Sequence, residues 1–278
     1  MGTYLFKIEC LTDMHVGNGE ANYSIIDNEV QKDTVLTDVP IIHASGVKGA
    51  LKEHFERVMK WDEGKVQEVF GGTIKEDNGK QITVGGEYKF FSAICIARPL
   101  RVSDGDLPYI LCTGDDILNN FSALLKGLGL SEFFKYIGIS FDAEKFLSTE
   151  ENVEIEGISA KRINPKQVII SEEISDKEIV LKNLKRLIGD KYAIAKSLRD
   201  YDLPIRARNV LDKNKQSENL WYEEIVPHKS IFYFALITPD VDTNYTKFKE
   251  DIEKQPVQFG GNASVGNGYT KVTEVGTK

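Results

Sequence analysis

Four side chains in strand-like or loop-like segments could carry acid–base chemistry. His15 follows a strand-like segment and precedes a glycine loop, so its imidazole could transfer a proton or bind a metal near neutral pH; the alternative is a structural histidine. Asp27 is a lone carboxylate in "SIIDNEVQKD", and an Asp-Asn pair is typical of a turn. Glu223 and Glu224 are adjacent in strand-like "LWYEEIVP", so they should point to opposite sides and cannot serve one centre as a close pair.

Two arginines on another strand-like segment could bind a phosphate backbone. Arg206 and Arg208 lie two residues apart in "LPIRARNVL", so they share one face and could straddle phosphates. An exposed hairpin edge would show the same pattern. The segment is therefore an RNA-contact candidate with a structural alternative.

A third candidate is the start of a helix. The stretch "DVPIIHASGVKGALKEHFERVMK" predicts a short strand, Ser45 as the N-cap, and a helix on which Lys48 and Lys52 lie one turn apart. Amides, a hydroxyl and an ammonium could converge there on a phosphate; the alternative is a capped helix with a solvated lysine. The apolar stripe of this helix is predicted to be Val47, Leu51, Phe55 and Val58.

The glycine-rich segment "QFGGNASVGNGYTKV" invites comparison with a phosphate-binding P-loop. Gly261 and Gly266 bracket four residues, but Asn267 and Gly268 stand where a P-loop has Lys and Ser or Thr, and a strand rather than a helix follows. The local pattern therefore predicts a glycine turn joining "PVQF" to "YTKVTEV". The tetrapeptide VGNG also occurs at 16–19, beside the first strand-like segment.

The elements that must position these residues are strands at both ends of the chain and helices in the middle. "TYLFKIECL" alternates like a first strand, and a helical region is predicted from about residue 115 to 202, interrupted near 153–171. Strands return from Leu203, followed by a helix near 243–254. This order predicts one interlocked α+β body.

Composition points to an ordinary soluble chain. The net charge of −8 gives no global sign of nucleic-acid binding. Cys10, Cys95 and Cys112 form no C-x-x-C pair, which favours a reducing compartment. Because no apolar run is long enough for a leader or a membrane span, we expect a cytoplasmic protein without a membrane partner.

Seven motifs in a fixed order resemble a known family. They are "MHVGNG", "IDNEVQKD", "PIIHASGVKGALKEHF", "VFGG" with "FFSAICIARPLRV", "LPIRARNVLD", "LWYEEIVP" and "QFGGNASVGNGYTKV". The chain resembles the backbone subunits of type III-B CRISPR effectors, the Cmr complexes, within the RAMP superfamily. The resemblance implies a single RAMP-type domain over 1–278: a ferredoxin-like, RNA-recognition-type palm (1–114 and 230–278), a helical insertion (about 115–202) and a β-hairpin thumb (about 203–229).

The resemblance also implies a function. Copies of such a subunit stack in a helical filament on the guide (CRISPR) RNA, beside other Cmr subunits, and target RNA is cleaved at regular intervals. Asp27 matches the family's nuclease aspartate and would accept the hydroxyl proton or help to hold a divalent ion, typically Mg²⁺. The implied supporting groups are His15, Tyr222 and one of Glu223 or Glu224. The implied RNA-binding residues are Ser45, Lys48, Lys52, Arg206, Arg208, Gly260, Gly261, Gly266 and Gly268.

Three alternatives remain at this stage. The chain could be a guide-binding backbone in which Asp27 is inert, or a guide-processing endoribonuclease that acts alone, without metal, through histidine. It could also be a nucleotide-binding protein that uses the glycine loop.

Two residues depart from the family pattern: His43, just before the helix start, and Gly46, within it. The net charge is acidic, so RNA binding would require a basic groove confined to the RNA path through Lys48 and Arg206.

Overall fold

The computed structural model describes residues 1–19, 25–75, 81–101, 109–134, 153–155, 158–160, 186–189, 192–195, 197–200 and 202–277. Most of the predicted helical insertion lies outside these residues. Of the described helices, none is long and apolar enough to cross a membrane.

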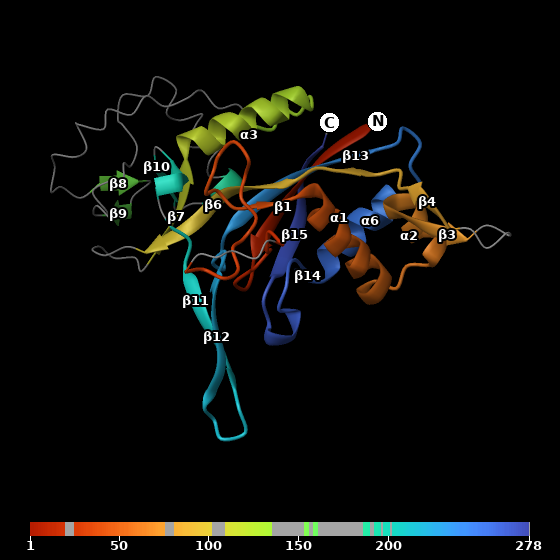
Figure 1. The fold of residues 1–278 in the computed structure, drawn as a ribbon. Coiled ribbons are helices and arrows are strands. Elements are labelled where there is room, and N and C mark those ends of the chain that lie inside the picture. Colours follow the sequence, from red (N-terminus) through yellow and green to blue (C-terminus); the bar gives the residue numbers. More distant parts are fainter. Residues whose placement is uncertain are drawn as a thin grey trace.

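A large sheet runs through the centre of the described structure (Figure 1). Its nine strands have the order β10-β7-β6-β13-β1-β15-β14, with β2 attached to β6 and β5 to β13. All pairs are antiparallel except β10 with β7. The bounds are β1 (Gly2–Cys10), β2 (Ile41–Ile42), β5 (Lys89–Phe90), β6 (Ala93–Arg101), β7 (Tyr109–Gly114), β10 (Tyr192–Ala195), β13 (Ile231–Thr238), β14 (Val257–Gln258) and β15 (Tyr269–Thr277). The predicted α+β class is confirmed.

Helices cover both faces of this sheet. On one face lie α1 (Ala44–Glu53), α2 (Glu63–Phe70) and α6 (Tyr245–Lys254), where Phe248 of α6 packs against Phe6 of β1. On the other lies α3 (Asp115–Gly127), whose Phe121 contacts Tyr233 of β13. Because side chains alternate along a strand, Tyr233 and Phe234 point to opposite faces, and β13 is buried along nearly its whole length.

The helix for which Ser45 was predicted as the N-cap begins two residues earlier, at Ala44. Its N-cap is His43, with no side-chain cap bond, and Ser45 is exposed in the first turn. The Ser45 N-cap prediction is therefore wrong. The Ser92 hydroxyl, from a distant segment, accepts the Ala44 amide at 3.1 Å and so satisfies a donor at this helix end.

The predicted apolar stripe of the same helix holds for three of its four positions. Val47, Leu51 and Phe55 are buried, but Val58 is 46% exposed. The reason is a π-helical turn (His54–Val58), which needs more residues per turn than an α-helix and rotates position 58 away from the core.

A second correction concerns the end of the predicted helical region. Tyr192–Ala195 forms β10, which pairs in parallel with β7, and the side chains of Tyr192 and Ile194 are buried. A helical pattern was predicted for this segment; burial beside β7 overrides it. Short 3₁₀ turns follow at Leu198–Asp200 and at Ala263–Val265.

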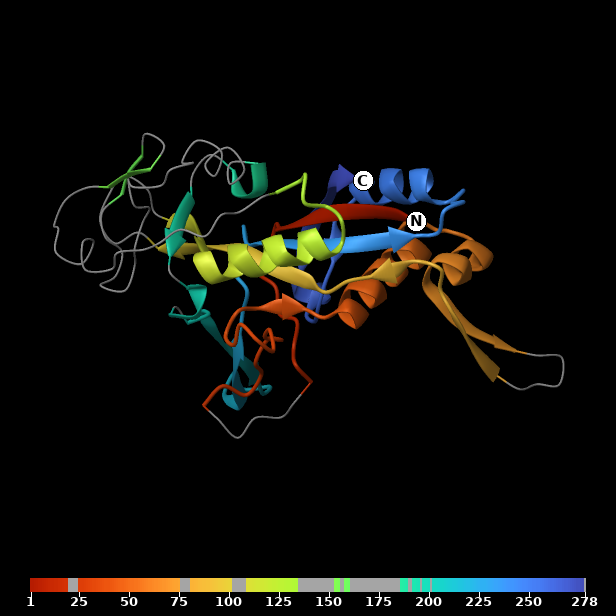
Figure 2. The same ribbon diagram turned by 90° about the horizontal axis from the view of Figure 1, so that it is seen from above.

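Two long hairpins leave the central body. The first pairs β11 (Ile205–Leu211) with β12 (Ser217–Glu224) and projects away from the sheet (Figure 1). The second pairs β3 (Gly71–Lys75) with β4 (Gln81–Gly85) and projects from another part of the molecule (Figure 2). A third, short pair joins β8 (Val153–Ile155) to β9 (Ile158–Ala160). The strands predicted on either side of the polar turn after Leu211 are confirmed.

Candidate functional site

Four separate parts of the chain meet where the β11–β12 hairpin joins the body. They are the loop after β1 (residues 11–19), the segment 25–40, the hairpin base (residues 204–206 and 221–228) and the glycine loop (residues 259–268). We call this region the hairpin junction. Short backbone bridges link Met14 to Val226, Gly17 to Val30 and Asn28 to Glu223.

Asp27 lies at the surface of the junction, fixed to β12. Its Oδ2 accepts the Tyr222 amide at 2.8 Å, and its own amide and that of Asn28 donate to the Tyr222 carbonyl at 3.1 Å. The residue is exposed, and within the described part of the chain Oδ1 has no hydrogen-bond partner. Asp27 therefore presents one anchored and one open carboxylate oxygen.

His15 is buried beside the same strand. Its Nδ1 lies 2.7 Å from the main-chain carbonyl oxygen of Glu224. Because a carbonyl only accepts, Nδ1 carries the proton, and in the neutral ring Nε2 is the basic nitrogen. This contact orients His15 towards Gly17, whose Cβ position would lie 3.1 Å from Nε2.

Glu223 and Glu224 point to opposite sides of β12, as predicted from their spacing. Both are buried, at 5% and 6% exposure. Glu224 accepts the Val30 amide at 3.2 Å and pairs with Lys32 at 3.2 Å. Glu223 accepts from Trp221, Asn262 and Arg208, with distances of 2.7, 3.3 and 3.4 Å. Neither carboxylate is open in the way that Asp27 is.

The two arginines share one face of β11, as predicted, and both are paired within the protein. Arg206 binds the Asp13 carboxylate and the Asn267 side-chain oxygen, the latter at 3.3 Å. Arg208 pairs with Glu223 and lies over the Trp221 ring, 5.8 Å from its centroid. Arg206 therefore joins the hairpin to the glycine loop, whereas the contacts of Arg208 lie within the hairpin.

Asp13 is a junction residue that sequence reasoning missed. Besides Arg206, it accepts the His228 amide at 2.8 Å, while its carbonyl accepts the Gly268 amide at 2.8 Å. Burial raises the pKa of Asp13, but the His228 hydrogen bonds and the Arg206 charge outweigh it and hold that pKa below 3.8. Its partners lie far away in the chain, so the only sequence signal was its place after the first strand.

The glycine loop is a turn between β14 and β15, as predicted, and it packs against the loop after β1. The Gly261 amide donates to the His15 carbonyl at 2.9 Å, which brings the VGNG regions from both ends of the chain together. Gly260 and Gly268 have positive φ, and a Cβ would overlap the carbonyl oxygens of His15 and Phe259, respectively. Gly261 and Gly266 meet no such obstacle and are exposed.

The helix start connects to the junction through Gln31, which sequence reasoning also missed. Its side-chain oxygen accepts the His43 amide at 2.9 Å, and its side-chain nitrogen donates to the Gly17 carbonyl at 3.2 Å. Lys48 is half-buried on α1. Lys52 faces another direction, donating to the Gly71 carbonyl at 3.0 Å. The structure thus links His43 at the helix start, through Gln31, to the loop that carries His15, while Lys52 contacts Gly71 instead.

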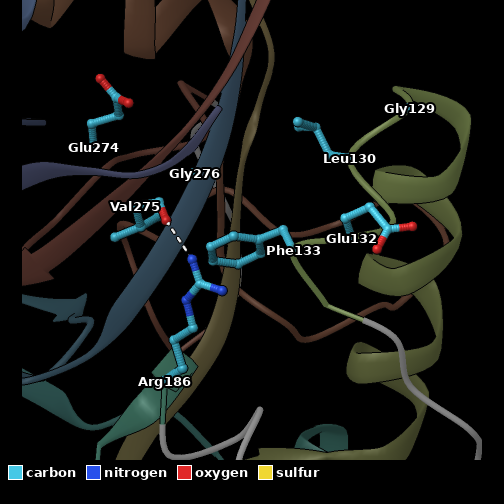
Figure 3. Close-up of a pocket in the computed structure, with 8 residues that line it drawn as sticks. All are labelled: Gly129, Leu130, Glu132, Phe133, Arg186, Glu274, Val275 and Gly276. Atoms are coloured by element: carbon cyan, nitrogen blue, oxygen red, sulfur yellow. Dashed lines mark hydrogen bonds between the residues drawn. The ribbon is translucent and has the colours of Figure 1, made fainter. Parts of the chain in front are cut away.

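A pocket elsewhere does not involve any predicted site residue. It lies between the residues after α3 and the end of β15, where Arg186 stacks over Phe133 at 4.4 Å and donates to the Val275 carbonyl at 3.1 Å (Figure 3). Among the described residues, no group of three or more His, Cys, Asp or Glu side chains could hold a metal ion.

Comparison with known proteins identifies the family. The model of the RAMP superfamily matches residues 7–271. The CRISPR system Cmr endoribonuclease Cmr4 of Pyrococcus furiosus is 27% identical over 305 residues, covering 98% of this chain and 96% of that protein. A chain of the type III-B Cmr-beta complex bound to cognate target RNA has the same fold, with a TM-score of 0.66, 20% identity and coverage of 98% and 97%. Oligomeric Cmr4 from Pyrococcus furiosus matches with a TM-score of 0.63 and 22% identity, covering 99% of this chain and 98% of that one. The resemblance seen in the sequence is confirmed, and the chain belongs to the RAMP superfamily.

Proposed function

We propose that this chain is the repeated backbone subunit of a type III-B CRISPR complex, which binds guide RNA and cleaves target RNA at regular intervals. The support is similarity over nearly the whole length to a protein named as a Cmr endoribonuclease, and a shared fold with a subunit of a target-bound Cmr complex. Copies of the chain would form a helical filament along the guide, together with other Cmr subunits.

The arrangement of Asp27 carries the nuclease part of the proposal. Its carboxylate is held by the Tyr222 amide at the base of a projecting hairpin, with one oxygen open to solvent. Of the three carboxylates proposed for catalysis, Asp27 alone is exposed, since Glu223 and Glu224 are buried against donors. An RNA strand lying along the hairpin base could therefore reach Asp27.

Cleavage of RNA by its own 2′-hydroxyl requires that the reacting groups be correctly positioned. The RNA 2′-oxygen attacks the adjacent phosphorus while the bond to the 5′-oxygen breaks, provided that the nucleotide is held in line. Asp27 would accept the 2′-hydroxyl proton, and protonated His15 Nε2 or water would supply a proton to the departing oxygen. The products would be a 2′,3′-cyclic phosphate and a 5′-hydroxyl.

We propose that the divalent cation is Mg²⁺. The open oxygen of Asp27 would be its single protein ligand. Mg²⁺ in proteins commonly keeps several waters and is held by one or two carboxylates with substrate phosphates. When bound, it would supply charge neutralisation at the phosphate. Asp27 would then hold the ion as an alternative to accepting the proton, since only one of its carboxylate oxygens is open.

The topology supports the proposed division into palm and thumb. Four neighbouring strands have the order β6-β13-β1-β15, and the chain runs β1-α1-β6 and β13-α6-β15. This is the β-α-β-β-α-β arrangement of a ferredoxin-like palm. We propose that the palm comprises 1–114 and 230–278, that the thumb is the hairpin within 203–229, and that a helical insertion occupies about 115–202.

The proposed guide-RNA surface is revised by the contacts. Ser45 and Lys48 at the start of α1 and the exposed glycines Gly261 and Gly266 are free to approach a phosphate backbone. Gly260 and Gly268 serve packing first. Arg206, Arg208 and Lys52 would have to share their protein partners with RNA.

The decisive experiment assembles the complex with guide and target RNA and compares Asp27→Ala with the unchanged subunit. We expect cleavage at the regular sites to be lost while binding of both RNAs is kept. Glu218→Gln, which alters an exposed carboxylate on the same hairpin, is the matched control and should cleave normally. Persistent cleavage by Asp27→Ala would show a non-catalytic backbone, and cutting of guide precursor by the isolated chain would show a processing enzyme.

A further inference from the structure

The adjacent carboxylates of Glu223 and Glu224 contact two different loops. Glu224 receives the Val30 amide and Lys32 from the segment that carries Asp27. On the opposite side of β12, Glu223 receives Asn262 from the glycine loop and Arg208 from the hairpin. Each carboxylate therefore joins β12 to one of the two loops that flank it.

Burial and donor count argue against direct contact between these carboxylates and RNA. Each of the four carboxylate oxygens accepts at least one hydrogen bond from the protein: those of Glu224 from Val30 and Lys32, and those of Glu223 from Trp221, Asn262 and Arg208. A carboxylate buried against donors loses that stabilisation if it turns to another partner. Asp27, in contrast, already faces solvent.

Lys32 links Glu224 to the Asp27 segment. Its ammonium lies 3.2 Å from Glu224, 3.8 Å from Glu29 and 3.8 Å from Asp38. Without this cation, three carboxylates would face one another around one point. The pair with Glu224, which is the shortest and the most buried, is the contact that joins the segment to β12.

Backbone hydrogen bonds also hold the Asp27 segment against β12. The amides of Asp27 and Asn28 donate to the Tyr222 carbonyl, and the Glu224 amide donates to the Asn28 carbonyl at 2.9 Å. The segment thus runs beside β12 with an isolated parallel bridge at Asn28. It is held at Asp27 by Tyr222 and further along, at Val30 and Lys32, by the Glu224 side chain. The position of the Asp27 carboxylate depends on both fastenings.

We propose that Glu223 and Glu224 form a two-sided clamp of positioning residues, in which Glu224 with Lys32 holds the Asp27 segment and Glu223 holds the glycine loop. This inference deepens the proposed function and rests on it for the role of Asp27. It replaces the sequence-based assignment of these glutamates as catalytic groups, and it adds Lys32 and Asn262 to the residues on which cleavage and RNA contact depend.

The clamp can be tested without cleavage, by amide hydrogen exchange on the isolated full chain. Glu224→Gln and Lys32→Met should speed exchange of the Asp27, Asn28 and Val30 amides about tenfold, with β1 and β13 unchanged. Glu223→Gln is the matched control: it should leave those amides unchanged. Lys32→Arg should keep their protection. Unchanged exchange at these amides in both Glu224→Gln and Lys32→Met would overturn the proposal.

A second measurement in the assembled complex separates positioning from catalysis. Glu224→Gln should slow single-turnover target cleavage about tenfold at every pH from about 6 to about 9, so that the pH profile keeps its shape. A changed profile, or a loss as complete as that of Asp27→Ala, would make Glu224 catalytic and overturn the clamp. If Asp27→Ala itself still cleaves, the proposed function fails, while the exchange experiment still decides the clamp.

Discussion

The aromatic core beneath α6 and the hairpin junction are held together by opposite means. In the core, Phe248 is fully buried among the rings of Phe6, Phe55 and Phe70. In the junction, three ion pairs link the hairpin and the loops: Asp13 with Arg206, Glu223 with Arg208, and Glu224 with Lys32. Apolar packing has no preferred direction, whereas hydrogen-bonded ion pairs fix geometry.

This difference indicates that the aromatic core chiefly provides stability and that the hairpin junction chiefly provides function. The core brings together β1, α1, α2 and α6 and should supply most of the free energy of folding. The junction should contribute less to that free energy, because its charges lose hydration when they pair, but it sets where Asp27 and the glycine loop lie. Substitutions in the core should therefore chiefly lower the free energy of unfolding, and substitutions among the charged residues of the junction should chiefly lower target cleavage.

The largest effect is expected from Phe248→Ala. Removing a fully buried ring from a cluster of aromatic side chains should lower the free energy of unfolding by about 3–5 kcal/mol, measured by urea titration. Val265→Ala, at an exposed position in the glycine loop, is the control and should be nearly neutral. A loss below about 1 kcal/mol for Phe248→Ala would break the comparison, since the core would then not carry the stability.

Gly268→Ala should give the largest loss of stability in the junction. A Cβ there would overlap the Phe259 carbonyl oxygen, and the backbone has a positive φ of 79°. We expect a loss of about 2–3 kcal/mol, from strain and displaced backbone. Gly261→Ala, whose Cβ would meet only the His15 carbonyl oxygen at 4.0 Å, should be tolerated in the same titration and should weaken RNA binding instead. Equal losses for the two variants would contradict the packing role assigned to Gly268.

Sequence patterns predicted the core better than the junction, for a physical reason. Alternation located β1, a strand-like apolar run located β13, and spacing on α1 identified Val47 and Leu51, because these patterns depend on neighbours in the chain. The failure at Val58 came from a π turn, which helical periodicity does not anticipate. The failure at β10 came from pairing with β7, which is contributed by a distant part of the chain.

The junction depends on contacts between residues near opposite ends of the chain. The opposite orientation of Glu223 and Glu224 followed from strand geometry alone, but their partners Lys32 and Asn262 did not. Asp27 emerged from family resemblance, since local rules predict only a turn there. Asp13 and Gln31 had no sequence signal that distinguished them from other loop residues.

A buried carboxylate in the core region offers a smaller test. Burial raises the pKa of Asp251, but hydrogen bonds from Lys247, Lys254 and Trp61 outweigh it and lower that pKa to about 2. Because the folded-state pKa is depressed, the stabilisation is present above about pH 3.8 and is lost as pH falls towards about 2. Asp251→Asn should cost about 1–2 kcal/mol at neutral pH, and the difference should vanish near pH 2. A difference that persists unchanged at that pH would exclude the ion pairs as its cause.

Asp13→Asn should have the smallest effect on stability of these variants. It is also the variant that best distinguishes the hairpin junction from the aromatic core. The pKa of Asp13 is also depressed, so its contribution is present above pH 3.8 and decreases below it. Since Arg206 and His228 are partly exposed, Asp13→Asn should cost only about 1 kcal/mol in unfolding titrations at neutral pH. The same variant weakens the Asp13 contacts with Arg206 and His228, which help to join the loop after β1 to the hairpin. Hydrogen exchange at the Gly268 and His228 amides should therefore rise, and target cleavage should fall severalfold. The matched variant Asp251→Asn should show the reverse pattern, with a larger loss of stability and unchanged cleavage. If Asp13→Asn lost as much stability as Phe248→Ala, the junction would be part of the folding core rather than a frame for Asp27.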